Sequence, residues 1–478
     1  MSSAQPPARQ LVPLLLALVF VALVAISHTI GPQPDAETRV LESACRLLLD
    51  NTTEGRQALV GSIWRPPVPF LLRLPLVRYL ADEALASRIV SVAFGLATLG
   101  LLYRIGGHWN LGRLRLPLLG ALALNPLFVH ETMNGSSRTT VAYLTLLAAQ
   151  GLARWVDRRS LQGLIYAGFA CAFMIGTSPD LLPWVAALQI LILCDLLMRS
   201  ARRGQREAAL ILGLLPAAYA LGVWCLMNWL ILGDPFYFVR SMFSAESRVA
   251  APIALASITW LHKLAGGLCG LALLVGFAKR NRALAYVAAA GLCLLLLMPV
   301  MARSQLPWDF RQIELCLTVL TVLAAAQAAA AAGGRLSIER TAWAWAPVSL
   351  ALAISWSPHA TAHPADAHSA AALPGIRAHV LHRSPYAKVF VCGYDSFRLL
   401  RAGAGPLFTH VLDFNLGQLK NDYFGHDLYV LIHRPRGRSA TDSVHWKHDR
   451  IFTLGTDNTL YDRDWGDWRL FEIIQARR

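Results

Sequence analysis

About eleven apolar runs divide the first 357 residues of this 478-residue chain, and most are long enough to cross a bilayer as a helix. A hydrocarbon core of roughly 30 Å needs about 20 mostly apolar residues in helical conformation. The chain is 55% hydrophobic and only 15% charged, whereas ordinary soluble domains carry about 25% charged residues. The sequence therefore predicts an α-helical polytopic membrane protein. The predicted spans are 12–31, 87–105, 115–131, 138–155, 161–177, 181–198, 208–231, 264–278, 283–301, 312–333 and 341–357.

Basic residues between these runs predict the orientation of the chain. With the N-terminus inside, the loops on the inner side hold sixteen Lys and Arg residues, counting Arg9, and the short outer loops hold six. An excess of Lys and Arg marks the cytoplasmic side. The same distribution argues against a nucleic-acid partner, although the net charge is +15. A cleaved signal peptide is the competing interpretation of run 12–31, but segment 27–32 lacks a small-x-small cleavage site.

The predicted organisation is a membrane domain over residues 1–357, with a first outer loop over 32–86, followed by a tail on the outer side. Residues 358–385 are rich in Ala, His and Pro and are predicted to be a linker. From 386 to 478, short β-rich runs alternate with turn-forming residues, which predicts a small soluble α/β domain. Its strands are expected at 388–394, 408–414, 427–433, 450–456 and 468–474.

Two acids stand just beyond the first span, Asp35 and Glu37. Carboxylates beside a bilayer are costly and therefore often functional. Two positions apart on a helix they point to different faces, so at most one enters a given site. Asp35 suits a general base that takes the proton of an acceptor hydroxyl. It also suits the N-cap of the helix that follows, which is a purely structural role.

A second acid lies where Asn125-Pro126 disrupts the third span near the outer surface. His130 and Glu131 emerge there, close in sequence to Arg138. Asp35 and Glu131, on separate outer loops, could therefore converge on one pocket. The alternative is that His130 and Glu131 are polar residues at the membrane surface that face water.

Basic residues of the outer loops are candidates for binding a lipid phosphate. Arg240 follows the aromatic run 236–238, and Arg303 and Arg311 flank Pro307-Trp308-Asp309. A guanidinium can bind phosphate through two parallel hydrogen bonds. Arg65 precedes two prolines in the first outer loop and is a further candidate. Ordinary anchoring at the membrane interface explains these aromatic and basic residues equally well.

The order of several motifs resembles the GT-C superfamily of membrane glycosyltransferases. The motifs are Asp35-Ala36-Glu37-Thr38-Arg39, Trp64-Arg65-Pro66-Pro67, Asp82-Glu83, Leu102-Tyr103-Arg104, Asn125-Pro126 and Gly233-Asp234-Pro235. Within the superfamily, the chain is most similar to bacterial relatives of glycosyltransferase family 39 and to the lipid A aminoarabinose transferases. The similarity covers roughly residues 12–310.

This resemblance implies a GT-C-like fold with its site at the outer face, a polyprenyl-phosphate sugar as donor, and an inverting transfer. Asp35 matches the catalytic acid of the family's first loop, and Glu131 matches a second acid that helps to bind a metal or the acceptor. Members often have Asp and Glu adjacent in the first loop, whereas Ala36 separates them here. No cofactor is certain, and a divalent metal ion at Glu131 is the one that the resemblance suggests.

The leading prediction is thus an enzyme of the bacterial inner membrane, with a cytoplasmic N-terminus and an extracytoplasmic C-terminus. It would transfer a hexose or pentose from a lipid-linked donor to a glycan, lipid or protein in the cell envelope or periplasm. A set of substrate-binding residues completes the predicted site: Glu37, Arg65, His130, Arg138, Arg240, Arg303 and Arg311.

Two other classes of function stay open at this point. A transporter or flippase of lipid-linked sugars would show internal repeats and interrupted helices at the middle of the membrane. A non-catalytic membrane scaffold would not need acids directed at a shared pocket. The acids of this chain cluster at one face, which favours the enzyme.

Overall fold

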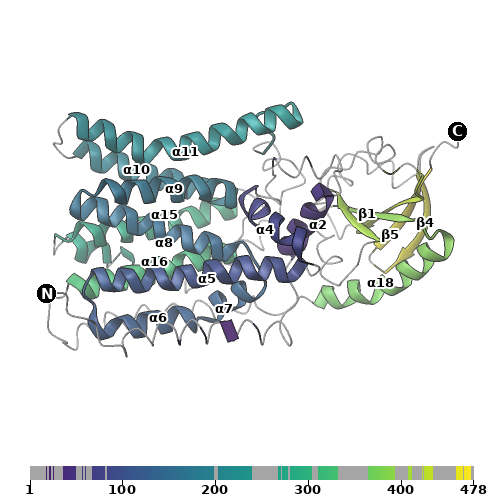
Figure 1. The fold of residues 1–478 in the computed structure, drawn as a ribbon, viewed down its shortest axis with the longest axis horizontal. Helices are drawn as coiled ribbons and strands as arrows, with labels where there is room; N and C mark the ends of the chain where they lie inside the picture. The colour runs from purple at the N-terminus through teal and green to yellow at the C-terminus, as the bar shows by residue number, and fades with distance from the viewer. Residues whose placement is uncertain are drawn as a thin grey trace.

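The computed structural model describes a helical bundle and a small mixed sheet (Figure 1). Isolated positions within 15–25, 56–60 and 267–277, and residue 423, are also described. The main described ranges are 36–49, 67–80, 83–198, 203–238, 280–303, 310–331, 364–392, 407–411, 425–433, 459–466 and 468–474. The helices of the bundle are α5 (Glu83–His108), α6 (Arg115–Ala123), α7 (Pro126–Met133), α8 (Arg138–Arg158), α9 (Leu161–Thr177), α10 (Leu182–Met198), α11 (Arg203–Leu232), α15 (Arg282–Arg303) and α16 (Phe310–Ala331).

Five of the described helical segments are long and apolar enough to cross a membrane, which confirms the polytopic helical fold class. They are Leu85–His108, Pro179–Met198, Arg206–Leu232, Arg282–Val300 and Arg311–Ala330. Helix α9 is apolar but shorter. The predicted runs 12–31 and 341–357 lie almost wholly outside the described residues, and run 264–278 is described only in part.

One predicted span is wrong as a continuous helix. Run 115–131 is divided into α6 and α7, because Pro126 begins a new helix and Asn125 adopts an extended conformation with ψ 119°. A proline has no N–H for the preceding turn and disfavours helical conformation in the residue before it. The break creates a short helix at the end of the bundle that faces the C-terminal domain (Figure 1).

Helix α8 lies at the centre of the bundle, with α5, α9, α15 and α16 around it. Its buried residues include polar ones, among them Thr145 and Gln150, and Thr145 Oγ1 donates a hydrogen bond to Cys316 Sγ in α16 (3.3 Å). A helix that is surrounded by protein need not present a continuous apolar face to lipid. This position explains why α8 crosses the bundle with less apolar character than its neighbours.

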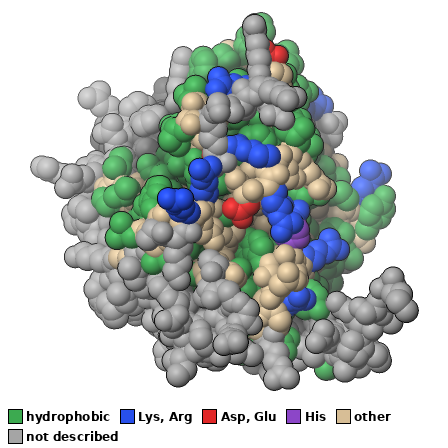
Figure 2. All heavy atoms as spheres, turned by 90° about the vertical axis from the view of Figure 1, so that its left-hand side faces the viewer, with side chains coloured by type: hydrophobic (Ala, Val, Ile, Leu, Met, Phe, Trp, Pro, Cys, Tyr) green, Lys and Arg blue, Asp and Glu red, His purple; other side chains and the backbone are tan. Residues whose placement is uncertain are grey.

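One end of the bundle is basic. The end away from the C-terminal domain gathers Lys and Arg side chains on its surface (Figure 2). One buried acid compensates part of this charge. Asp195 accepts hydrogen bonds from Trp155 Nε1 (3.0 Å), Arg159 Nη1 (2.7 Å) and Tyr286 OH (3.2 Å), which joins α8, α10 and α15. A buried carboxylate with three donors stabilises the packing of these helices.

The first outer loop contains two helices, α2 (Ala36–Leu49) and α4 (Pro67–Tyr79). They pack on each other and on the start of α5 through a small apolar core of their own. Its fully buried residues are Leu41, Ala44, Cys45, Phe70, Val77 and Ala86. These two helices therefore form a layer over one end of the bundle (Figure 1).

The C-terminal residues form a five-stranded sheet in the order β2-β1-β3-β5-β4, with parallel pairing among β2, β1 and β3 and antiparallel pairing from β3 to β4. The sheet lies within the range for which the sequence predicts a soluble α/β domain. The strands are β1 (Lys388–Cys392), β2 (Phe408–Val411), β3 (Leu428–His433), β4 (Thr459–Trp465) and β5 (Trp468–Ile473). The predicted strand 450–456 lies outside the described residues, and β4 was not predicted.

The linker predicted for 358–385 is corrected by helix α18 (Pro364–Arg383). Leu373, Ile376 and Val380 of α18 belong to the core of the sheet domain. The alanine-rich composition that suggested a linker also has high helix propensity. The C-terminal domain therefore begins with this helix and not at residue 386.

Substitution of Gly151 by Ala should destabilise the bundle. A Cβ at Gly151 would lie 2.5 Å from the carbonyl oxygen of Gly163, where α8 and α9 approach most closely. Backbone atoms must shift to make room, which costs about 1–3 kcal/mol. Thermal unfolding in detergent measures the effect. Gly100→Ala in α5 is the matched control, because nothing lies within 4 Å of its added Cβ. Equal unfolding temperatures for both variants would contradict the close packing.

Candidate functional site

The site is built on the break between α6 and α7. Asn125 caps α7, since its side-chain oxygen accepts a hydrogen bond from Phe128 N (3.0 Å), and Pro126 occupies the first turn, where its missing N–H is not needed. The helix has only eight residues. It ends at Asn134, and Gly135 follows with φ +74°, so that the chain turns directly into α8.

This geometry buries an acid. Glu131 is fully buried, and its Oε2 accepts a hydrogen bond from Arg138 Nη1 at 2.5 Å. The arginine comes from the first turn of α8 and reaches back over the turn at Gly135. Taking a carboxylate out of water is costly unless an opposite charge and hydrogen bonds compensate it. The pair therefore fixes the position of α7 relative to α8.

His130 lies at the edge of this pair. Its Nδ1 is 3.3 Å from Glu131 Oε1, and the amide nitrogen of Asn134 lies 3.2 Å from its Nε2. The same amide nitrogen also lies 3.1 Å from Nδ1, so the imidazole lies between Glu131 and the residue that ends α7. The side chain of His130 is 30% exposed, whereas that of Glu131 is 0% exposed. His130 is thus the member of the group that solvent or a ligand can reach.

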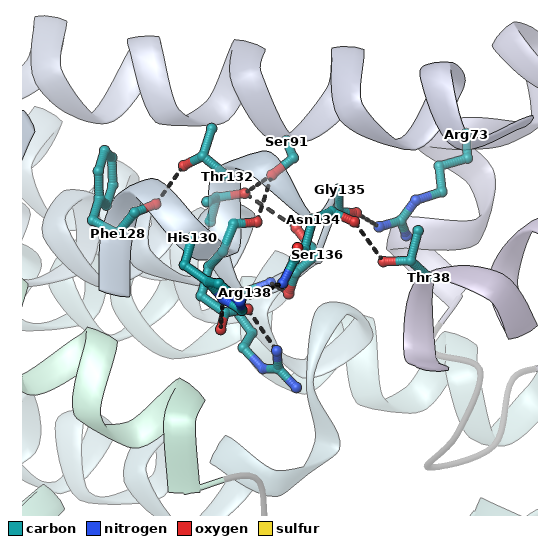
Figure 3. Close-up of polar contacts among 12 residues, drawn as sticks. Thr38, Arg73, Ser91, Phe128, His130, Thr132, Asn134, Gly135, Ser136 and Arg138 are labelled. Carbon is teal, nitrogen blue, oxygen red and sulfur yellow. Dashed lines mark hydrogen bonds and ion pairs between the residues drawn. The ribbon is translucent and has the colours of Figure 1, made fainter. Parts of the chain in front are cut away.

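The first outer loop is hydrogen-bonded to the turn after Glu131 (Figure 3). Thr38 Oγ1 in α2 donates to the carbonyl oxygen of Asn134 (3.4 Å), and Arg73 Nη2 in α4 donates to that of Gly135 (2.6 Å). Thr38, Asn134 and Arg73 are all buried. These bonds join segments that lie 96 and 62 residues apart in the chain.

Helix α5 supports the same turn from its own first turns. Ser91 Oγ donates to the carbonyl oxygen of Glu131 (3.2 Å) and lies 2.8 Å from Thr139 Oγ1. Gly135 packs so closely on α5 that a Cβ there would lie 2.9 Å from Ser87 Cβ. Only glycine suits this position, because both the positive φ and the close approach exclude a side chain.

The predicted site residues divide into three groups by what the structure describes. Asp35, Arg65 and Arg240 lie outside the described residues. Glu37 and Arg303 lie in helices α2 and α15, but their side chains are outside the described part. The structure describes His130, Glu131, Arg138 and Arg311 with their side chains.

Of these, the structure brings together His130, Glu131 and Arg138, which the sequence had placed in one outer loop. Arg138 was predicted to bind substrate, and the structure gives its guanidinium a partner within the protein. Arg311 is half-buried in the first turn of α16, next to Gln312, whose side chain donates to Ser178 Oγ (2.5 Å). The interpretation of Glu131 as a water-facing surface residue is wrong, because its side chain is fully buried.

The predicted convergence of the two outer loops is consistent with these contacts. Helix α2 begins one residue after Asp35, and Thr38 contacts Asn134, three residues after Glu131. The roles assigned to Asp35, Glu37 and the basic residues stay predictions.

The metal ion suggested at Glu131 also stays a prediction. Glu131 directs one carboxylate oxygen to Arg138 and the other to His130. Among the described residues, no group of three or more His, Cys, Asp or Glu side chains could hold a metal. The described residues therefore do not by themselves fit a metal site.

The loop after α11 has a structural role that the sequence did not reveal. Gly233 has φ +73°, and Asp234 Oδ1 accepts from Phe236 N (3.0 Å), which closes the turn. Phe238, predicted as part of an aromatic belt, is buried and stacks on Trp224 at 4.3 Å. Trp224 Nε1 in turn donates to the carbonyl oxygen of Val60 (2.5 Å). This second outer segment therefore anchors the first outer loop.

Sequence reasoning missed Arg73, Thr38 and Ser91. For Arg73 there was a signal: a single cation within the apolar run Phe70-Leu71-Leu72-Arg73-Leu74. A charge in such a run points to a polar partner inside the protein. Thr38 and Ser91 carry no comparable signal. Ser and Thr are common in helices, where their hydroxyl groups often donate to a carbonyl of the same helix.

No family model matches the chain, and no curated protein matches it. Among solved structures, the chain is similar to ArnT from Cupriavidus metallidurans bound to undecaprenyl phosphate, with 11% identity over 96% of this chain and 98% of that chain, at a TM-score of 0.38. It is also similar to the apo state of ArnT, with 12% identity over 95% and 97% of the two chains and a TM-score of 0.39.

The Glu131–Arg138 pair should show strong coupling in a double-mutant cycle. Glu131→Gln leaves Arg138 without its carboxylate, and Arg138→Met leaves a buried carboxylate, so each should lower the unfolding free energy by about 3–5 kcal/mol. The double variant should lose less than the sum of the two. Thermal unfolding in detergent measures all three. His130→Gln is the control and should have a small effect, since that side chain is partly exposed. Additive losses would contradict the pairing.

Proposed function

We propose that this chain is an integral membrane glycosyltransferase that moves a sugar from a polyprenyl-phosphate-linked donor to an acceptor outside the cytoplasm. The observation that carries the proposal is the hydrogen bonding of α2 and α4 to the turn between Glu131 and Arg138. It supports a single site at which both outer loops contribute. The resemblance of the sequence motifs to GT-C enzymes supports the same donor class.

The topology supports a lipid-linked donor. The basic end of the bundle lies opposite the C-terminal domain, which favours a cytoplasmic N-terminus and an outer site. Nucleotide sugars are made in the cytoplasm, so an enzyme with an outer site needs a sugar that is delivered on a lipid. A polyprenyl phosphate satisfies this need, because its tail stays in the membrane and its head reaches the site.

In the proposed reaction, Asp35 takes the proton of an acceptor hydroxyl as its oxygen attacks the anomeric carbon. The new carbon–oxygen bond forms on one side of the sugar, and the bond to the phosphate oxygen breaks on the other. The configuration is therefore inverted, and the phosphate leaves with its lipid. Holding donor and acceptor in line on opposite sides of the sugar supplies much of the rate by proximity.

The other predicted site residues have proposed roles in binding the donor and the acceptor. Basic side chains stabilise the negative charge that develops on the leaving phosphate; the candidates are Arg65, Arg240, Arg303 and Arg311. Glu131 and Arg138 hold the floor of the site as an ion pair, and His130 presents the exposed ring at its edge. Glu37 is a further polar residue for the acceptor.

Asp35→Asn should abolish sugar transfer while the protein is still made and inserted. Removing a general base typically lowers the rate by about 10²–10⁴-fold. The experiment complements a deletion strain with each variant and measures, by mass spectrometry, the glycans that the deletion lost. Asp50→Asn is the matched control, because it makes the same change within the same outer loop. Normal transfer by Asp35→Asn would reject Asp35 as the base.

A further inference from the structure

Among the described arginines, Arg73 is the most deeply buried, and two of its three guanidinium nitrogens have no hydrogen-bond partner in the described part of the chain. Its side chain is 1% exposed, and Nη2 donates to the carbonyl oxygen of Gly135 (2.6 Å). Its Nε and Nη1 have no hydrogen-bond partner in the part of the chain that the structure describes. A guanidinium carries five N–H donors, so one bond to a neutral carbonyl leaves most of them available.

The placement of Arg73 in α4 reverses the usual pattern of a surface helix. Leu71 and Leu72 are 50% and 37% exposed, whereas the arginine between apolar neighbours points inward. A helix with leucines outside and a cation inside suits lipid on its outer face and a polar ligand on its inner face. Ionisable residues within the membrane region typically face the protein interior and mark the path or the site of a substrate.

The other arginines that form described ion pairs in the bundle show what Arg73 lacks. Arg138 is paired with Glu131, and Arg159 is paired with Asp195. Their side chains are 12% and 37% exposed, so both are less buried than Arg73. Arg73 makes no ion pair with a described carboxylate. A buried charge without a counter-charge is strongly unfavourable, which points to an anion that is supplied from elsewhere.

We propose that Arg73 binds the phosphate of the lipid-linked donor, an inference that rests on the proposed function. The bond from Nη2 to Gly135 holds the guanidinium at the turn after Glu131, and Nε and Nη1 supply the donors for phosphate oxygens. A planar guanidinium matches phosphate better than a point charge does. The exposed leucines of α4 then lie on the side where the polyprenyl tail runs.

The turn at Gly135 makes this position a defined one. Its positive φ and its contact with Ser87 fix the carbonyl to which Arg73 donates. Glu131 comes four residues before Gly135 in the chain, but its carboxylate is paired with Arg138 and makes no ion pair with Arg73. A phosphate bound at Arg73 would therefore find a compensating charge at the same end of the bundle as the outer loops.

The test compares two short-chain lipids of equal length, a polyprenyl phosphate and the corresponding polyprenol, in binding to the purified full-length protein in detergent. Arg73→Gln should weaken binding of the phosphate by about tenfold or more and leave binding of the polyprenol unchanged. Arg73→Lys should lie between, because lysine keeps the charge without the fork. Arg78→Gln is the matched control on the same helix, since Arg78 is exposed, and should change neither affinity.

Three results would overturn the inference. The first is unchanged phosphate affinity in Arg73→Gln. The second is an equal loss of phosphate and polyprenol binding, which indicates a purely structural role. The third concerns the case in which Arg73→Gln does not fold. In that case, an Arg73→Lys variant that binds the polyprenyl phosphate as tightly as the wild type would overturn the inference. A wild-type protein that binds the phosphate no better than the polyprenol would instead reject the proposed function.

Discussion

The outer end of the bundle depends on how the main-chain carbonyls between α7 and α8 find hydrogen-bond donors. A helix end leaves its last carbonyls without partners in the helix, and near a membrane such groups are costly when they are buried. Here the side chains of Thr38, Arg73 and Ser91 donate to the carbonyls of residues 134, 135 and 131. Because these donors come from α2, α4 and α5, one short turn joins the two described helices of the first outer loop to the bundle.

Two fully buried acids, Asp195 and Glu131, lie at opposite ends of the bundle and are each held by basic or polar side chains. Asp195 accepts bonds from α8 and α15 at the basic end, and Glu131 pairs with Arg138 at the other. Neither acid lies in a chain of ionisable groups that crosses the bundle among the described residues. This arrangement supports chemistry at one surface more than it supports transport through the middle of the membrane.

The C-terminal domain lies at the same end of the bundle as the first outer loop (Figure 1). Helix α2 lies against strand β2, so the domain adjoins the loop that begins beside Asp35. Within the domain, α18 is held to β4 by polar as well as apolar contacts: His379 Nε2 and Arg383 Nη1 lie 2.7 Å and 2.8 Å from the two carboxylate oxygens of Asp462. These contacts fix α18 on the edge of the sheet.

Hydropathy alone was enough to place helices α5, α8, α9, α10, α11, α15 and α16, because length and apolar character are local properties of the chain. Charge in the loops likewise predicted a basic end, and Lys and Arg side chains do gather at the end of the bundle away from the C-terminal domain. Helix α18 and strand β4 were missed, since alanine-rich segments suit both helix and linker and a strand with charged residues looks like a loop. Only packing decided that α18 joins the sheet.

The candidate site likewise combines residues that could be found from the sequence with contacts that only the structure reveals. Asn125-Pro126, His130, Glu131 and Arg138 could be found from sequence, because a helix break and the polar residues that follow it are close together in the chain. The contacts of Thr38 and Arg73 with residues 134 and 135 could not be found from the sequence, since they join positions that are 96 and 62 residues apart. No local periodicity encodes such pairs. They arise only when α2 and α4 pack over the end of the bundle, where a buried carbonyl needs a donor.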